Sequence, residues 1–285
     1  MPPHVSSPIY ANFPSSNLTI GAGVAIFHLA SARVVVCYHS RDKYWFLPKG
    51  RRDVNEETGA AAEREGFEES GYRNRLLPLP LSHRQPRGSS PITSGSPYAT
   101  EPVWTQLIPQ SASVQYLLFW YVAETVPADV EAAMTAKEAA AAAAAAVSDS
   151  TAAAARTAAS ASPAHGAAAR SRSAYVPPPP FPPVLPLRAR VRQDSRVDGG
   201  VCEPVRHAGT GVDAEELLYE SQLLPIAEAR RKLRGSVMAD VVRVGWEAVG
   251  RRLEMEGGGG DEWIDDGAGA GTATSKSGDK LTAGS

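Results

Sequence analysis

A long tract of alanine and proline divides this chain of 285 residues into two parts that carry ordinary strand and helix patterns. The tract runs from 127 to 212 and includes an unbroken alanine run from Ala139 to Ala146 and the segment YVPPPPFPPVLP. Alanine favours a helix but buries little surface, and consecutive prolines favour an extended conformation. We therefore expect 127–212 to be a disordered insertion that has no packed core of its own.

The segments before the tract contain strand patterns and one helix pattern. The residues from Thr58 to Ser70 lack proline and predict a helix, with Thr58 as its N-cap and Gly71 just beyond its C-terminal end. Stretches rich in β-branched and aromatic residues predict five strands, which are NLTIGAGVAIFHL, ARVVVCYHS, KYWFLP, VWTQLIP and SVQYLLFWYVAETV.

The segments after the tract complete the domain. ELLYESQLLP predicts a strand, and IAEARRKL and VMADVVRVGWEAVGRRL predict amphipathic helices separated at Gly235. The strands before the tract need a surface to pack against, and these helices can provide it. The sequence therefore predicts one α/β (α+β) domain, formed by residues 18–126 and 213–255, with flexible tails at 1–17 and 256–285.

Composition limits the partners and the location. The formal net charge is −2, and no long basic segment is present, so we expect no DNA partner. No run of about 18 apolar residues could span a membrane, and the first residues lack an apolar signal-like segment. Cys37 and Cys202 are far apart, which predicts free thiols in a reducing compartment. We expect a monomer in the cytoplasm or the nucleus.

Three glutamates crowd the end of the predicted helix. Glu65, Glu68 and Glu69 lie three and four residues apart, so they share one helix face, where like charges destabilise the helix. A bound cation would compensate, and Mg²⁺ prefers carboxylate oxygens. The alternative is an acidic, solvated helix surface with Arg64 nearby. The helix by itself leaves both interpretations open.

The wider spacing resembles a known motif. The stretch from Gly50 to Tyr72 matches the pattern G-x5-E-x7-R-E-U-x-E-E-x-G-U, in which U is a bulky apolar residue, and thus resembles the Nudix box. Its fixed positions are filled by Gly50, Glu56, Arg64, Glu65, Glu68, Glu69 and Gly71. One position departs, because Gly66 stands where the family usually has leucine, isoleucine or valine.

The resemblance implies a fold and a chemistry. Nudix proteins have a mixed sheet between helices, and the enzymes hydrolyse a nucleoside diphosphate, or another diphosphate, linked to a group X with Mg²⁺ or Mn²⁺. By this match the box supplies Gly50, Glu56 and Gly71 as structural loop residues, and Arg64 as a catalytic-site residue that pairs with Glu56. Expected metal ligands are Glu65, which is alternatively a general base, Glu68, Glu69, the backbone carbonyl of Lys49, and either Glu215 or Glu216 from outside the box. Glu101 and Glu124 are weaker candidates.

The substrate and two other classes of function stay open. FLPKGR at the entrance of the box resembles diadenosine tetraphosphate, diphosphoinositol polyphosphate and mRNA-decapping hydrolases, which favours dinucleoside polyphosphates or inositol pyrophosphates as the small phosphorylated substrate. A non-catalytic Nudix module that binds a ligand or a protein is the alternative, suggested by Gly66. The Pro-rich segment 177–186 is a candidate site for a partner protein.

Overall fold

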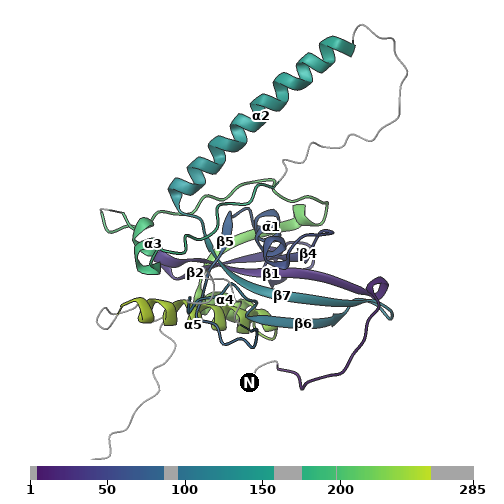
Figure 1. The fold of residues 1–285 in the computed structure, drawn as a ribbon, viewed down its shortest axis with the longest axis vertical. Helices are drawn as coiled ribbons and strands as arrows, with labels where there is room; N and C mark the ends of the chain where they lie inside the picture. Colours follow the sequence, from purple (N-terminus) through teal and green to yellow (C-terminus); the bar gives the residue numbers. More distant parts are fainter. Residues whose placement is uncertain (1–4, 87–95, 157–174, 197, 258–285) are drawn as a thin grey trace, which may run out of the picture.

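A computed structural model describes residues 5–86, 96–156, 175–196 and 198–257. An eight-stranded mixed sheet lies between helix α1 (Thr58–Ser70) on one face and helices α4 (Ile226–Lys232) and α5 (Val237–Gly257) on the other (Figure 1). This arrangement confirms the predicted class, a mixed α/β sheet between helices. In the part of the chain that the structure describes, no helix is both long and apolar enough to cross a membrane.

The centre of the sheet is a parallel pair of long strands. β1 (Leu18–His28) runs beside β7 (Gln115–Thr125), in register from Leu18 opposite Gln115 to Phe27 opposite Glu124. The two strands read as nearly continuous apolar runs because helices cover both of their faces. The shorter strands pair with them or with β2, and are β2 (Arg33–His39), β3 (Tyr44–Phe46), β4 (Lys49–Arg51), β5 (Asn74–Leu76) and β6 (Trp104–Pro109).

The last strand joins the two parts of the chain. β8 (Tyr219–Pro225) follows the alanine and proline tract and pairs antiparallel with the whole of β2, from Arg33 opposite Pro225 to His39 opposite Tyr219. One sheet therefore contains strands from both sides of the tract. The segment before β8, which was expected to be strand, is instead a short 3₁₀ turn at Glu216–Leu218.

Each face of the sheet buries a separate apolar cluster. Small residues of α1, Ala61 and Ala62, pack on β1 residues such as Val24, so that this helix lies close to the sheet. On the other face, Trp120 of β7 and Phe27 of β1 meet α5, where Trp246 lies 5.3 Å from the ring of Phe27.

The structure corrects the expected start of α1. The N-cap residue is Glu57, and its side chain makes no capping hydrogen bond. Thr58 belongs to the helix, and its hydroxyl lies 2.7 Å from the hydroxyl of Tyr121. The C-terminal end is as predicted, because Gly71 adopts a left-handed conformation with φ of 77° and its N–H bonds to the carbonyl of Phe67.

The structure also corrects the expectation that the tract lacks core contacts. Its alanine part forms helix α2 (Ala128–Arg156), which projects from the domain (Figure 1). Its later part, including α3 (Leu187–Gln193), packs on the main core through Phe181 and Leu187, which are 5% and 0% exposed. Alanine and proline dominate the composition and conceal these few large anchors. Residues 157–174 and the ends 1–4 and 258–285 lie outside the described residues.

Candidate metal centre

Helix α1 brings two glutamates against the short strand β4. Glu65 and Glu69 are 5% and 9% exposed. The backbone N–H of Lys49 donates to Oε2 of Glu69 at 2.6 Å, which places the backbone of Lys49 beside these carboxylates. A Cβ atom at Gly50 would overlap the carboxyl group of Glu65, so a side chain at this position would displace that carboxylate.

Arg64 ties the loop of the motif to the helix. Its guanidinium donates to both carboxylate oxygens of Glu56 at 2.9 Å, as the sequence predicted. It also donates to Glu65 at 2.9 Å and to Glu68 at 2.7 Å. Because its donors are occupied by three carboxylates, Arg64 orients the loop and the helix and has little left to offer a substrate.

A third acid comes from outside the motif. Carboxylate oxygens of Glu65, Glu69 and Glu216 all lie within 4.8 Å of one another. Glu216 stands at the start of the 3₁₀ turn before β8, and the backbone N–H of Val212 donates to its carboxylate. Of the two candidates from the sequence, Glu216 reaches the group and Glu215 does not. Glu68 lines the same hollow but is turned toward Arg64.

Of the two weaker candidates, Glu101 is absent from the acidic group and from the lining of the hollow, and Glu124 has other partners. Glu124 is fully buried on β7 and forms ion pairs with Arg75 at 2.7 Å and Arg190 at 2.8 Å. It therefore holds the tract to the sheet and lies outside the acidic group.

Burial makes the acidic group unfavourable without a counter-ion. Removal from water raises the pKa of Glu65 to about 7, against an ordinary value of 4.5. Burial raises the pKa of Glu69 well above its usual range, and raises that of Glu216 as well. The charge of Glu216 adds to the rise in pKa of both Glu65 and Glu69. Hard oxygen donors that are buried together fit Mg²⁺ or Mn²⁺.

The acidic group opens into a hollow of about 900 Å³. Lys49, Arg51 and Arg52 of the loop line it together with Tyr116 of β7, whose hydroxyl donates to the carbonyl of Gly50 at 2.8 Å. The hollow is large enough for a small phosphorylated molecule.

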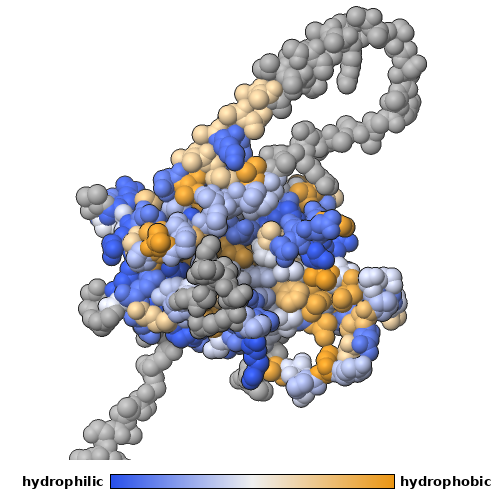
Figure 2. Space-filling view, in the orientation of Figure 1, coloured by the Kyte–Doolittle hydropathy of each residue, from blue (hydrophilic) through white to orange (hydrophobic). Residues whose placement is uncertain are grey.

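A second hollow of about 930 Å³ has a different character. Trp104, Gln106 and Trp120 line it, and Lys49 borders both hollows. Figure 2 shows hydrophobic surface gathered over the region of β6 and β7. An acidic and an apolar space therefore meet at one residue of β4.

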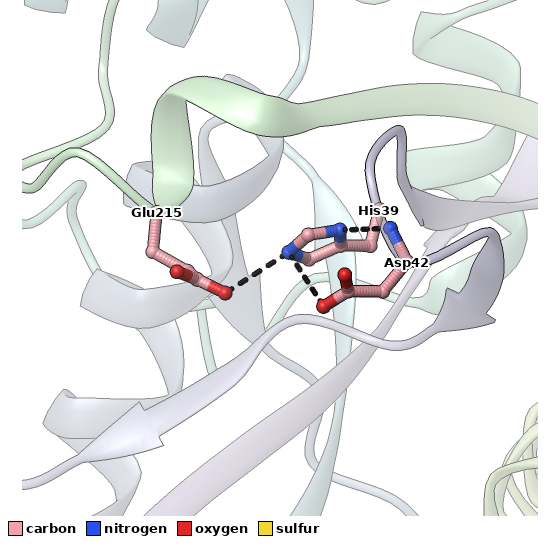
Figure 3. Close-up of side chains that lie close together, drawn as sticks. All are labelled: His39, Asp42 and Glu215. Atoms are coloured by element: carbon pink, nitrogen blue, oxygen red, sulfur yellow. Dashed lines mark hydrogen bonds and ion pairs between the residues drawn. The ribbon is translucent and has the colours of Figure 1, made fainter.

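A further polar cluster lies beside the first hollow and was missed by the sequence reasoning. His39, Asp42 and Glu215 converge from β2, the turn after it and the loop before β8 (Figure 3). The histidines showed no metal-type spacing, and the separation of His39 and Glu215 along the chain left no local signal. Only the pairing of β2 with β8 brings them together.

The chain was compared with family models, with curated proteins and with solved structures. No family model matches the sequence, and no curated protein matches it either. Part of this chain is similar to solved structures of Nudix hydrolases. A NUDIX-family hydrolase from Clostridium perfringens shares 24% identity over 38% of this chain and 69% of its own, with a TM-score of 0.28.

Two further Nudix structures match a similar share of this chain. A MutT NUDIX hydrolase from Burkholderia pseudomallei shares 19% identity over 38% of this chain and 67% of its own, with a TM-score of 0.26. An Ap4A hydrolase from C. elegans shares 16% identity over 39% of this chain and 71% of its own, also with a TM-score of 0.26. Each likeness covers less than half of this chain.

Proposed function

We propose that this protein is a metal-dependent hydrolase that cleaves a phosphoanhydride bond in a nucleoside diphosphate linked to a group X, or in a related diphosphate. The observation that carries the proposal is the group of Glu65, Glu69 and Glu216, whose carboxylate oxygens lie within 4.8 Å of one another at the floor of an open hollow. Buried carboxylates in such numbers are unfavourable unless a cation joins them.

The residues at the floor have separate roles in this proposal. Glu65, Glu69 and Glu216 hold Mg²⁺ or Mn²⁺, with Glu68 and the backbone carbonyl of Lys49 beside them. A bound ion neutralises charge on the phosphate oxygens and lowers the pKa of a bound water molecule. Arg64 keeps Glu65 and Glu68 in place through hydrogen bonds of 2.9 and 2.7 Å.

Glu65 has a second candidate role as the acceptor of the proton from the attacking water. Ligand and base are separable by experiment. If Glu65 is the base, Glu65→Gln lowers turnover while Mn²⁺ still binds with the affinity of the wild type. If Glu65 is a ligand, the same substitution weakens Mn²⁺ binding as well.

The cations around the hollow favour a substrate with few phosphates. Arg64 is occupied by carboxylates. Lys49, Arg51 and Arg52 are the remaining basic residues that line the hollow, and Arg52 uses one N–H for the carbonyl of Glu56 at 2.8 Å. An inositol pyrophosphate carries many more charges than these three cations can match. We therefore favour a nucleoside diphosphate derivative or a dinucleoside polyphosphate, with the apolar hollow at Trp104 and Trp120 next to it.

A non-catalytic module is the second candidate, and Gly66 was its motivation. The space expected for a bulky residue is already filled, because a Cβ at Gly66 would lie 2.6 Å from Nδ2 of Asn74 and 2.9 Å from Cγ1 of Val24. The departure from the motif is thus matched by its neighbours and leaves the acidic group assembled. A partner protein at 177–186 would have to share a segment whose Phe181 is buried in this domain.

The test is a panel of diphosphates assayed for phosphoanhydride cleavage with Mg²⁺, with Mn²⁺ and with a chelator. We expect cleavage only with metal, and higher kcat/KM for nucleoside diphosphate derivatives than for inositol pyrophosphates. Binding of these compounds without cleavage under any metal would favour the non-catalytic module. The exposed Glu254 on α5 provides a matched control, Glu254→Gln, which should behave as the wild type.

A further inference from the structure

We propose that the turn His39–Asp42 is a clasp that positions Glu216 by holding its neighbour Glu215, with His39 as the positioning residue. This inference rests on the proposed function, because it concerns the acid that completes the metal centre. It gives a role to the polar cluster of Figure 3, which the proposed reaction does not otherwise use.

The turn grips both ends of the short segment that carries Glu216. At one end, Nε2 of His39 lies 3.0 Å from Oε1 of Glu215, and the guanidinium of Arg41 donates to the same oxygen at 2.9 Å. At the other end, the backbone N–H and the hydroxyl of Ser40 donate to the carbonyl of Leu218 at 3.0 and 2.8 Å. Glu216 lies between these two attachments.

The hydrogen bonds of His39 fix its role as a donor. Its side chain is completely buried, and its Nδ1 accepts the backbone N–H of Asp42 at 3.0 Å. A neutral imidazole that accepts at Nδ1 carries its hydrogen on Nε2, so Nε2 donates to Glu215. A metal ligand would need a free lone pair on Nε2. The cluster of His39, Asp42 and Glu215 is therefore a hydrogen-bonded clasp and no second metal centre.

Aromatic neighbours hold the ring of His39 in this orientation. Tyr44 stacks on it with ring centroids 5.2 Å apart, and Tyr219 packs at 5.4 Å. These contacts confine the ring, and Nε2 then lies nearer to Oε1 of Glu215, at 3.0 Å, than to Oδ2 of Asp42, at 3.6 Å. The position of Glu215 is thus determined by the rigid end of β2.

The backbone then transmits this position to Glu216. Oδ1 of Asp213 accepts the N–H groups of both Glu215 and Glu216, at 2.8 and 2.9 Å. The two residues share one anchor, so displacement of Glu215 would displace Glu216 from Glu65 and Glu69. Residues that orient metal ligands in this way commonly affect metal affinity by 10- to 100-fold, an order-of-magnitude range.

The first experiment compares two adjacent glutamates by their Mn²⁺ affinity, measured by calorimetry on the full chain. Glu215→Gln keeps an oxygen that can accept from His39, so we expect an affinity within about threefold of the wild type. Glu215→Ala removes the anchor and should weaken binding by about 10-fold or more. Glu216→Gln removes a ligand and should weaken it further. The side chain of Glu215 is 48% exposed, so its truncation leaves no buried cavity.

The second experiment changes the donor. His39→Gln places an amide N–H near the position of Nε2 and should restore much of the affinity that His39→Leu loses. At saturating Mn²⁺ the kcat of His39→Leu should recover toward the wild type, because the clasp acts on the position of a ligand. A melting curve of each variant establishes that it is folded.

The outcomes separate the clasp from the metal centre. Unchanged Mn²⁺ affinity in a folded Glu215→Ala would overturn the clasp, and so would a loss in Glu215→Gln as large as that in Glu216→Gln, since Glu215 would then be a ligand. If Glu216→Gln itself binds Mn²⁺ like the wild type, the proposed metal centre is wrong and the clasp fails with it. A small loss of Mn²⁺ affinity in Glu215→Gln, a larger loss in Glu215→Ala and the largest loss in Glu216→Gln would support both the clasp and the metal centre.

Discussion

Gly66 shows how a single residue can mislead a motif comparison. The family pattern has a bulky apolar residue at this position, and glycine is unfavourable inside a helix. In the structure, Asn74 fills the space, and its Nδ2 donates to the carbonyl of Glu63 at 2.9 Å. Moving the side chain of Asn74 would break this hydrogen bond. The sequence could not reveal this because Asn74 lies on β5, after the end of the helix.

We therefore expect Gly66→Leu to destabilise the protein by about 1–3 kcal/mol, the usual range for overpacking a filled site. The gain in helix propensity, about 1 kcal/mol, works against this loss and is smaller. Urea denaturation of the chelated protein measures the difference. A raised free energy of unfolding in Gly66→Leu would contradict this prediction and show that Asn74 and Val24 can move to accommodate leucine.

The buried acids also predict an unusual dependence on pH. The pKa of Glu65 is raised by burial from 4.5 to about 7 in the folded protein, so between these values the folded state binds more protons than the unfolded state. The stabilisation is complete below pH 4.5 and is lost as the pH rises through 7. Since one pKa unit corresponds to about 1.4 kcal/mol, the free energy of unfolding changes by up to about 3 kcal/mol over this range.

In chelator, melting temperature should therefore fall between pH 4.5 and 7, and Glu65→Gln should flatten that part of the profile. Excess Mg²⁺ should oppose the fall, because metal binds the deprotonated carboxylates. The control Glu254→Gln should keep the wild-type profile. An identical profile for wild type and Glu65→Gln would contradict a raised pKa of Glu65 in the folded protein.

At the scale of elements, the alanine and proline tract divides into parts with different roles. Arg190 of α3 is fully buried and pairs with Glu124 and Asp194, both at 2.8 Å. The end of the tract crosses α1, where the hydroxyl of Thr210 donates to the carbonyl of Glu68 at 2.8 Å, before the chain reaches Glu216. Composition predicted a disordered insertion because it averages over these few anchoring residues.

Two replacements test this division. Replacing residues 140–174 by a Gly/Ser linker of about eight residues should preserve folding and hydrolysis, because the two ends of the replaced segment lie close together. Glu138 pairs with Arg73, and Tyr175 packs on Phe67. Arg73 in turn lies over the ring of Phe67. Loop shortening changes the closure entropy only slightly.

Replacing 128–210 should instead cause loss of folding. It removes Phe181 and Leu187 from the core and leaves Glu124 paired with Arg75 alone, and breaking a buried ion pair costs about 3–5 kcal/mol. Expression, melting curves and hydrolysis of both replacements give the readout. A stable, active protein without 128–210 would instead support the expectation that the whole tract contributes nothing to the core.

For the molecule as a whole, the sequence predicted the α/β class, the strands around the motif and the pairing of Arg64 with Glu56. These features depend on local periodicity and on one contiguous motif. The sequence did not show whether Glu215 or Glu216 joins the acidic group, because the two residues are neighbours. Only the path of the chain into β8 decides which of them faces α1. The clasp at His39 and the anchors Phe181 and Leu187 likewise depend on contacts between distant segments.

The most direct test of the central claim is the rate of phosphoanhydride cleavage by Glu69→Gln and Glu216→Gln on the best substrate of the panel, at saturating Mg²⁺. Metal charge stabilisation is worth several kcal/mol, so each variant should lose about 100-fold or more in kcat while it remains folded. Glu254→Gln should keep the wild-type rate. Wild-type turnover in both Glu69→Gln and Glu216→Gln, or equal cleavage in chelator, would contradict a metal centre built on these carboxylates.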